Sequence, residues 1–346
     1  QKQFAKSSKK FKLFKVFDFI HLLKTNFQVN FILGTNICID ESMIKFKGKN
    51  SLKQYLPLKP IKRGYKVWCL ADSLTGYLYN FDIYTGKQET RQGALSESVV
   101  LQLINNLNLV NHQLFFDNFF TSIPLLLQLK QKKIGTTGTI RTNGKLFPTE
   151  PLLKEKLKRG EYKYCSYNQI SVVKWQDRKP VFVATNSFDP RETETIFRGE
   201  KDGSKQRIIC PQMISKYNKF MGGVDSFDQR ISCYSIDRQS KRNWFRIFIY
   251  FLQASLSNAL IFYNDLNEQH MDYIDFLSSI SMSLIGDVST RKRKGRPVHF
   301  SAQKLRRIQM TTKNKSLSTQ LLAHMPVAGP KGRCGYCSTK ARPIFS

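Results

Sequence analysis

Four aspartates are the residues of this chain whose type and spacing best suit chemistry: Asp40, Asp117, Asp225 and Asp228. Asp40 and Asp117 are each predicted to end an apolar strand, and open α/β sheets place their sites at the carboxyl ends of strands. Asp225 and Asp228 follow two glycines, and their spacing of three puts both carboxylates on one face if that segment is helical. Crowded carboxylates raise one another's pKa unless a cation neutralises them, and acidic oxygen clusters suit Mg²⁺ or Mn²⁺.

The chemistry that such a site favours is phosphoryl transfer. Two ions about 4 Å apart activate the attacking oxygen and stabilise the leaving oxygen of an in-line displacement. The chain carries 56 Lys and Arg against 25 Asp and Glu, a formal net charge of +31, which attracts polyanions. Together these features indicate phosphodiester chemistry on DNA or RNA. The pattern alone leaves a structural role open, because aspartates after strands are also turn formers and aspartates after glycines are also helix caps.

The elements that would position these aspartates alternate between strands and helices. Residues 67–84 predict a hairpin that turns near Gly76. Residues 96–107 predict a helix capped by Ser96, and a second helix is predicted to begin at Ser122. This order predicts an α/β fold in which helices pack on a mixed sheet.

Composition excludes several classes of protein. The 346 residues are 41% hydrophobic and 12% aromatic, which excludes a chain that is disordered throughout. The most apolar run, 247–264, contains Gln253 and Asn258 and is typical of a buried helix, so no membrane partner is expected. The seven cysteines are odd in number and lie mostly in apolar contexts, which is typical of reduced thiols inside cells. The start at Gln1 shows no signal peptide and is expected to be that of a fragment or processed product.

Short motifs in a fixed order carry a family resemblance across residues 37–264, about two-thirds of the chain. They are Ile39-Asp40-Glu41-Ser42-Met43, Lys45-Phe46-Lys47-Gly48, Lys53-Gln54-Tyr55, Lys66-Val67-Trp68, Tyr84-Thr85-Gly86, Phe116-Asp117-Asn118-Phe119, Gly138-Thr139-Ile140-Arg141, Ser171-Val172-Val173-Lys174-Trp175, Met221-Gly222-Gly223-Val224-Asp225 and Tyr234-Ser235-Ile236-Asp237-Arg238. Through their number, order and spacing the sequence resembles the piggyBac-type transposases.

The resemblance implies a ribonuclease-H-like mixed sheet with flanking helices, an inserted mainly β subdomain and a surrounding helical DNA-binding part. It implies cut-and-paste transposition at TTAA sites, in which one strand is cleaved at each transposon end, a hairpin forms and is reopened, and the freed end attacks target DNA. Asp40, Asp117 and Asp225 would be catalytic, with Asp228 as the fourth acid. Two Mg²⁺ or Mn²⁺ ions are expected, one held by Asp40 and Asp225, the other by Asp40 and Asp117.

The partners implied are double-stranded DNA, as transposon terminal repeats and TTAA target, and a second copy of the full-length chain, with action in the nucleus. The expected parts are a helical dimerisation and DNA-binding remnant (1–34), the first part of the core (35–143), the inserted subdomain (144–212), the last core helix (213–234), a helical DNA-binding part (235–285), a basic linker (286–330) and the start of a zinc module (331–346).

Basic residues near two of the motifs are candidate DNA contacts. Those of the first hairpin region, which would follow a phosphate backbone, are Lys45, Lys47, Arg63 and Lys66, accompanied by Lys49, Lys59 and Lys62. Those expected to meet transposon-end DNA are Arg238, Lys241, Arg242 and Arg246. The alternative for each is a solvated basic face.

The carboxyl-terminal region departs from the family pattern. Cys334 and Cys337 resemble the opening of the family's zinc module, but a structural zinc site needs four ligands. Zn²⁺ is therefore expected only where the rest of that module is present, and the chain is expected to be truncated at both ends. The leading interpretation is a transposase core. The alternatives are a transposase-derived protein that binds DNA without cleaving it, and a metal-dependent nuclease on the same core.

Overall fold

A computed structural model describes residues 12–57, 59–86, 94–154, 156–199, 203–236, 240 and 242–286. The strands are β1 (Asn36–Lys45), β2 (Gln54–Tyr55), β3 (Arg63–Asp72), β4 (Leu78–Ile83), β5 (Gln113–Phe116), β6 (Gly135–Thr139), β7 (Tyr162–Tyr167), β8 (Ile170–Gln176), β9 (Pro180–Thr185), β10 (Thr193–Gly199) and β11 (Lys205–Pro211). The helices are α2 (Phe17–Val29), α3 (Leu95–Ile104), α4 (Ile123–Gln131), α5 (Thr149–Leu153), α6 (Gln212–Phe220), α7 (Gly223–Cys233), α8 (Asn243–Leu266) and α9 (Tyr273–Ile285).

Within this part of the chain, nine strands form one mixed sheet in the order β2-β3-β1-β5-β6-β9-β8-β7, with β4 paired to β3. The pairs β1–β5 and β5–β6 are parallel, whereas the other pairs are antiparallel. β10 and β11 pair separately. The α/β prediction with helices on a mixed sheet is therefore confirmed.

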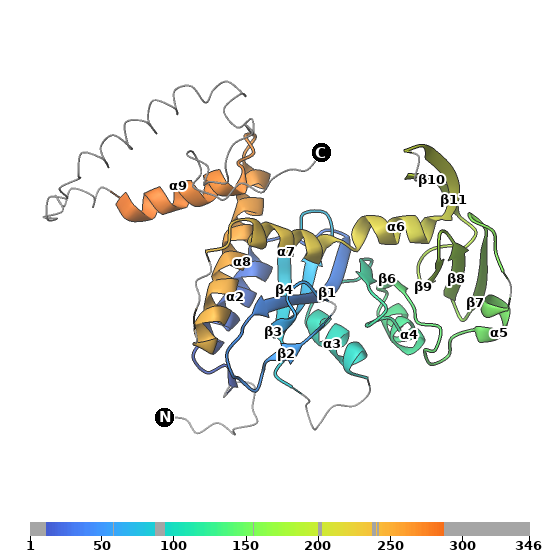
Figure 1. Ribbon diagram of the computed structural model, residues 1–346, viewed down its shortest axis with the longest axis horizontal. Helices are drawn as coiled ribbons and strands as arrows, with labels where there is room; N and C mark the ends of the chain where they lie inside the picture. The colour runs from blue at the N-terminus through green and yellow to red at the C-terminus, as the bar shows by residue number, and fades with distance from the viewer. Residues whose placement is uncertain are drawn as a thin grey trace, which may run out of the picture. The chain divides into compact units, whose positions relative to one another are not determined.

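Helices cover both faces of the β1–β5 region of the sheet (Figure 1). On one face α2, α7 and α8 bury apolar side chains such as Phe27 and Phe251 against Phe81 of β4. On the other face α3 and α4 pack Leu103 and Leu126 against the same sheet. β1 contributes side chains to both cores, because successive residues of a strand point to opposite faces of the sheet.

The predicted hairpin at residues 67–84 is confirmed as the antiparallel pair β3–β4. The Oδ1 atom of Asp72 accepts hydrogen bonds from the backbone N–H groups of Leu74 and Thr75, at 3.0 and 2.8 Å. Gly76 closes the turn with a φ of 68°, in the left-handed region that glycine adopts without a Cβ penalty. Local turn chemistry thus fixes the hairpin.

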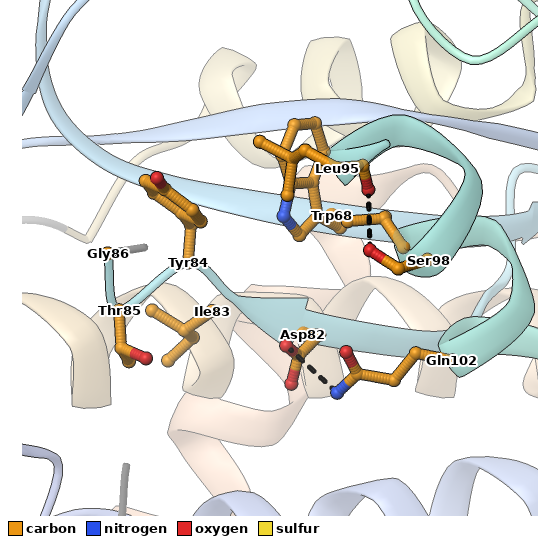
Figure 2. Close-up of a pocket in the computed structure, with 10 residues that line it drawn as sticks. Trp68, Asp82, Ile83, Tyr84, Thr85, Gly86, Leu95, Ser98 and Gln102 are labelled. Carbon is orange, nitrogen blue, oxygen red and sulfur yellow. Dashed lines mark hydrogen bonds between the residues drawn. The ribbon is translucent and has the colours of Figure 1, made fainter. Parts of the chain in front are cut away.

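The two predicted helix starts have different outcomes. Ser122 caps α4 as predicted, since its hydroxyl accepts the N–H of Leu125 at 3.2 Å. Ser96 is not the cap of α3: the helix begins at Leu95, after Ala94, and has no side-chain cap. Inside that first turn the hydroxyl of Ser98 instead donates to the carbonyl of Leu95 at 3.0 Å, as Figure 2 shows.

α8 is the one helix, within the described residues, that is long and apolar enough to cross a membrane. Its polar residues nevertheless lie in the protein interior and make hydrogen bonds there. Asn258 exchanges two hydrogen bonds of 2.9 Å with the backbone of Leu78, and Gln253 donates to the carbonyl of Ile231. These contacts agree with the interpretation of this run as a buried helix.

Candidate active site

The register of two parallel strands brings the first pair of aspartates together. In the β1–β5 pairing Ile39 lies opposite Phe116, which is the last residue of β5. Asp40 and Asp117 are the next residues of the two chains, so they stand side by side where the parallel pairing ends. β5 ends directly before Asp117, in agreement with the prediction, but the prediction that a strand ends at Asp40 is wrong. β1 continues to Lys45 because β3 pairs with it over its whole length, Asp40 opposite Cys69.

A glycine brings the second pair of aspartates to this strand. A Cβ on Gly223 would lie 2.6 Å from the carbonyl oxygen of Asp72 and 2.7 Å from the sulfur of Cys38. The first turn of α7 therefore rests directly on β1 and β3, as only glycine permits. The helix predicted here is confirmed, and its spacing puts Asp225 and Asp228 on one side.

Hydrogen bonds fix three of the carboxylates. The hydroxyl of Ser42 donates to Oδ1 of Asp228 at 2.5 Å, and the hydroxyl of Tyr250 on α8 donates to Ser42 at 2.8 Å. Oδ1 of Asp40 accepts the N–H of Glu41 at 2.7 Å, and Oδ1 of Asp117 accepts the N–H of Phe119 at 2.9 Å. The site therefore draws on β1, the end of β5, α7 and α8.

Burial and mutual repulsion raise the pKa of three of these carboxyl groups. Loss of hydration, followed by the charge of Glu41, raises the pKa of Asp40 to about 7, and Asp117 adds to this shift. Burial, followed by the charge of Asp225, raises the pKa of Asp228 to about 6, although the bond from Ser42 lowers it. The pKa of Asp117 is also raised, chiefly by burial. The region holds more negative charge than its own cations neutralise.

Two lysines, Lys59 and Lys66, bring positive charge to the site, and the carboxylate of Glu41 lies between them. Its two carboxylate oxygens lie 3.0 Å from Nζ of Lys59 and 3.6 Å from Nζ of Lys66. The Lys66 ammonium also lies 3.8 Å from the ring centroid of Trp68 and 4.8 Å from that of Phe119. Burial lowers the pKa of Lys66, and Glu41 partly offsets this effect.

A cavity of about 600 Å³ opens beside the acids. Glu41, Lys59, Asp225 and Asp228 line its polar part. Further polar and charged side chains, among them Lys45, Gln229 and Arg246, line the cavity together with apolar ones such as Ile231. A separate cavity of about 190 Å³ lies between β4 and α3, beside Trp68 (Figure 2). None of the four aspartates lines that smaller cavity.

The donor set fits a hard divalent cation, since buried carboxylates with raised pKa values favour a bound positive charge. Asp40 and Asp117 stand side by side by register, and Asp225, in the first turn of α7, acts together with Asp40 to raise the pKa of Lys59. Within the residues that the structure describes, however, no three His, Cys, Asp or Glu side chains form a group that could hold a metal ion. The carboxylates are instead held by the hydrogen bonds above and by the charge of Lys59.

Comparison with known proteins identifies the family. A family model described as Transposase IS4 matches residues 2–260. Human PiggyBac transposable element-derived protein 3 is 30% identical over 276 residues, which cover 76% of this chain and 46% of that protein. The chain belongs to the piggyBac-type transposases. Human PiggyBac transposable element-derived protein 2 is also 30% identical, over 71% of this chain and 43% of its own length, so the chain spans less than half of either relative.

A solved structure of the piggyBac transposase, in a synaptic complex with hairpin DNA, has the same fold. The match has a TM-score of 0.71 and 25% sequence identity, and it covers 92% of this chain and 64% of that one. The ribonuclease-H-like fold of a piggyBac-type transposase, implied by the sequence motifs, is therefore confirmed.

The candidate DNA contacts of this piggyBac-type core fall into different environments. Lys45, Lys47 and Arg63 are exposed. Arg242 is exposed as well, and it lines a cavity of about 580 Å³ together with Lys15, Lys49 and Trp244. Arg238, Lys241, Cys334 and Cys337 lie outside the described residues, as does the basic segment 291–297.

Two of the predicted DNA contacts, Arg246 and Lys66, have side chains that are largely buried and engaged with partners inside the protein. Arg246 is 8% exposed, and its guanidinium donates to the carbonyl of Lys45 at 3.0 and 2.7 Å. Lys66 is 9% exposed and is held by Glu41 and Trp68, as described above. Burial of an arginine or lysine requires partners of this kind. Arg246 also lines the cavity of about 600 Å³, and its contact with DNA, like that of Lys66, stays a prediction.

Sequence reasoning missed several residues that surround the aspartates. Ser42 and Tyr250 hold Asp228. Tyr217 of α6 lies close enough to the site for the aspartates to act on it. Burial raises the pKa of Tyr217 most, a hydrogen bond with Thr139 lowers it, and the charges of the aspartates raise it further. Lys59 was considered only as one of several lysines along a phosphate backbone. Its position after Pro57 in a loop gave no local signal that it reaches the acids.

Proposed function

We propose that this chain is the catalytic core of a cut-and-paste DNA transposase, which cleaves and joins DNA strands at TTAA sites in a reaction that depends on divalent metal ions. The observation that carries the proposal is the convergence of aspartates from three distant segments, Asp40 with Asp117 by strand register and Asp225 with Asp228 by the packing of α7. Membership of a transposase family makes DNA the natural substrate for that convergence.

The residues have distinct roles in this proposal. Asp40, Asp117 and Asp225 would hold Mg²⁺ or Mn²⁺, which when bound supplies an activated water and stabilises the leaving oxygen of the cleaved strand. Ser42 and Tyr250 orient Asp228 beside them. Asp40 is 9% exposed, and this burial strengthens the electrostatic interactions that its carboxylate makes.

Double-stranded DNA is the proposed partner, as transposon terminal repeats and as TTAA target. The net charge of +31 and the exposed Lys45, Lys47, Arg63 and Arg242 support backbone contacts on the protein surface. The structurally similar piggyBac transposase is described in a synaptic complex with hairpin DNA, which supports the same class of substrate. Joining two transposon ends calls for two copies of the full-length chain, and we extend the proposal to such a homodimer acting in the nucleus.

The test is cleavage of a labelled duplex that carries the element's terminal repeat and a flanking TTAA. We expect nicking at the TTAA boundary with Mg²⁺, none with EDTA, and a loss of about 10³-fold or more for Asp117→Ala. Asp265→Ala, at an exposed position of α8, is the matched control and should cleave as the wild type does. Wild-type cleavage by Asp117→Ala would contradict the proposal, and thermal unfolding of both variants checks that they fold.

The second candidate is a DNA-binding protein that does not cleave DNA. It is favoured by one observation: in the described residues the carboxylates do not form a group that could hold a metal ion. Binding of the terminal repeat without nicking, in Mg²⁺ and in Mn²⁺ alike, would support this candidate. A simple nuclease would nick the duplex but would fail to join a pre-cleaved transposon end to TTAA-containing DNA, which separates it from a transposase.

A further inference from the structure

Lys59 places a positive charge among the aspartates. It lies in the loop between β2 and β3, and its ammonium is 3.0 Å from a carboxylate oxygen of Glu41. Burial lowers its pKa, but the charges of Asp40, Glu41 and Asp225 outweigh that effect and raise the pKa above its ordinary value. The same ammonium lowers the pKa of Asp40, Asp117 and Asp228, so one cation acts on acids from three segments.

Glu41 holds this ammonium in a defined position. Its side chain is 11% exposed and is fixed on its other side by Lys66, whose ammonium lies on the ring of Trp68. On β1, Cys38 packs in the core on the side of α7, and Ile39 packs in the core on the side of α3 and α4. Asp40 shares the face of Cys38, and Glu41 shares the face of Ile39. Strand alternation therefore directs Glu41 away from the face of Asp40, and Glu41 binds lysines while Asp40 stays with the acids.

Lys59 is also accessible to a ligand. Its side chain is 37% exposed, and it lines the cavity of about 600 Å³ together with Asp225 and Asp228. An ammonium that is both held by a carboxylate and open to a cavity is a ready anion-binding group. If a DNA strand enters this cavity, the anionic group that it brings to Lys59 is a phosphate.

We propose that Lys59, positioned by Glu41, is a phosphate-binding residue of the active site. In the free protein its ammonium is the counter-charge of the aspartates. When DNA is bound, the same ammonium contacts the phosphate of the strand to be cut. This inference rests on the proposed function, because it takes DNA as the ligand. It assigns Glu41 a positioning role rather than a place among the metal ligands.

The first test measures DNA affinity in Ca²⁺, so that cleavage does not interfere. Lys59→Met should weaken binding of the terminal-repeat duplex about tenfold, the magnitude expected for one charge-assisted contact. Replacing the phosphate at the cleavage position by an uncharged methylphosphonate should weaken wild-type binding similarly and abolish the difference between wild type and variant. An affinity loss of equal size on both duplexes would overturn the phosphate contact.

The matched control is Lys62→Met, because Lys62 is exposed in the same loop, three residues further along the chain. It should lower affinity less, and equally on both duplexes. Lys59→Arg retains the charge and should recover part of the affinity. Glu41→Gln should weaken binding through Lys59, so adding it to Lys59→Met should cause little further loss, whereas full additivity would exclude the positioning role.

The second test needs neither DNA nor cleavage. In EDTA at pH 8, Lys59→Met should unfold at a lower temperature than wild type and Lys62→Met, since the aspartates lose their counter-charge. Mn²⁺ should reduce that difference by supplying the missing positive charge. If Lys59→Met unfolds like Lys62→Met, the inference fails. If the wild type does not nick DNA in Mg²⁺, the proposed function fails instead, so the two failures are read from separate assays.

Discussion

Two of the places where the main sheet buries polar side chains differ sharply: the surroundings of Asn186, just after β9, and those of Asp40 on β1. The Oδ1 atom of Asn186 accepts the N–H of Thr136 at 2.6 Å. Its amide nitrogen donates to the carbonyls of Leu126 and Ile134, each at 3.1 Å. The neutral side chain of Asn186 thus satisfies three backbone groups, all of them inside the protein.

The region around Asp40 has the opposite character. The pKa of the Asp40 carboxyl is raised to about 7 and that of Asp228 to about 6, although the charge of Lys59 lowers both values. A buried polar group with all its partners stabilises the fold, whereas a buried excess of charge destabilises it until a ligand arrives. The difference between Asn186 and Asp40 thus separates structural from functional polarity in one sheet.

The largest effect on stability is expected at the neutral region. Asn186→Ala leaves the N–H of Thr136 and two carbonyls without partners, which should lower the free energy of unfolding by about 4 kcal/mol. Urea unfolding measures this change. Asn218→Ala, at an exposed position of α6, is the control and should change it by less than about 0.5 kcal/mol. A loss below about 1 kcal/mol at Asn186 would contradict the comparison.

The charged region should reveal itself in the pH dependence of stability. A carboxyl whose folded pKa lies near 7 binds its proton more tightly in the folded than in the unfolded chain, where the pKa is about 4. Stability should therefore fall as pH rises from about 4 to 7, and the loss persists above pH 7. We expect a loss of about 2 kcal/mol, less than the pKa shift alone implies, because neighbouring charges relax together.

Asp40→Asn should flatten that pH dependence, leaving the smaller contributions of Asp228 and Asp117. Asn186→Ala should lower stability at every pH without changing the slope. Denaturant unfolding between pH 4 and pH 8 in EDTA measures both variants against wild type. If Asp40→Asn keeps the full slope, or Asn186→Ala alters it, the division into a charged and a neutral region is wrong.

Local sequence patterns predicted the elements whose causes are local. The hairpin at residues 67–84 depends on the turn at Asp72 and Gly76, and the start of α4 depends on Ser122. The end of β1 was misjudged because Asp40 resembles a strand terminus, while the strand continues through pairing with β3, which begins at Arg63. A run of residues carries no sign of a partner that lies elsewhere in the chain.

The same limit explains which parts of the site were foreseen. The aspartates were found through motifs, and strand register and the glycine at position 223 account for their meeting. The contacts of Ser42 with Asp228 and Tyr250 span 186 and 208 residues, so no local pattern announces them. Arg246 was expected at a DNA surface because its charge is visible in the sequence, whereas the carbonyl of Lys45 that buries it is not.

The smallest effects, about 1 kcal/mol each, are expected where the relay from Tyr250 through Ser42 reaches Asp228. Tyr250→Phe removes a hydrogen bond between two neutral hydroxyls, so its loss of stability should be the same at pH 5 and pH 8. Ser42→Ala removes a bond that lowers the pKa of Asp228, and that bond favours the charged carboxylate. Its loss should therefore be larger at pH 8, above the pKa of about 6, than at pH 5. Urea unfolding of both variants at the two pH values measures these losses. If Ser42→Ala loses the same free energy of unfolding at pH 5 and pH 8, the hydrogen bonds from Tyr250 and Ser42 have a structural role, like those of Asn186, and are not part of the charged site.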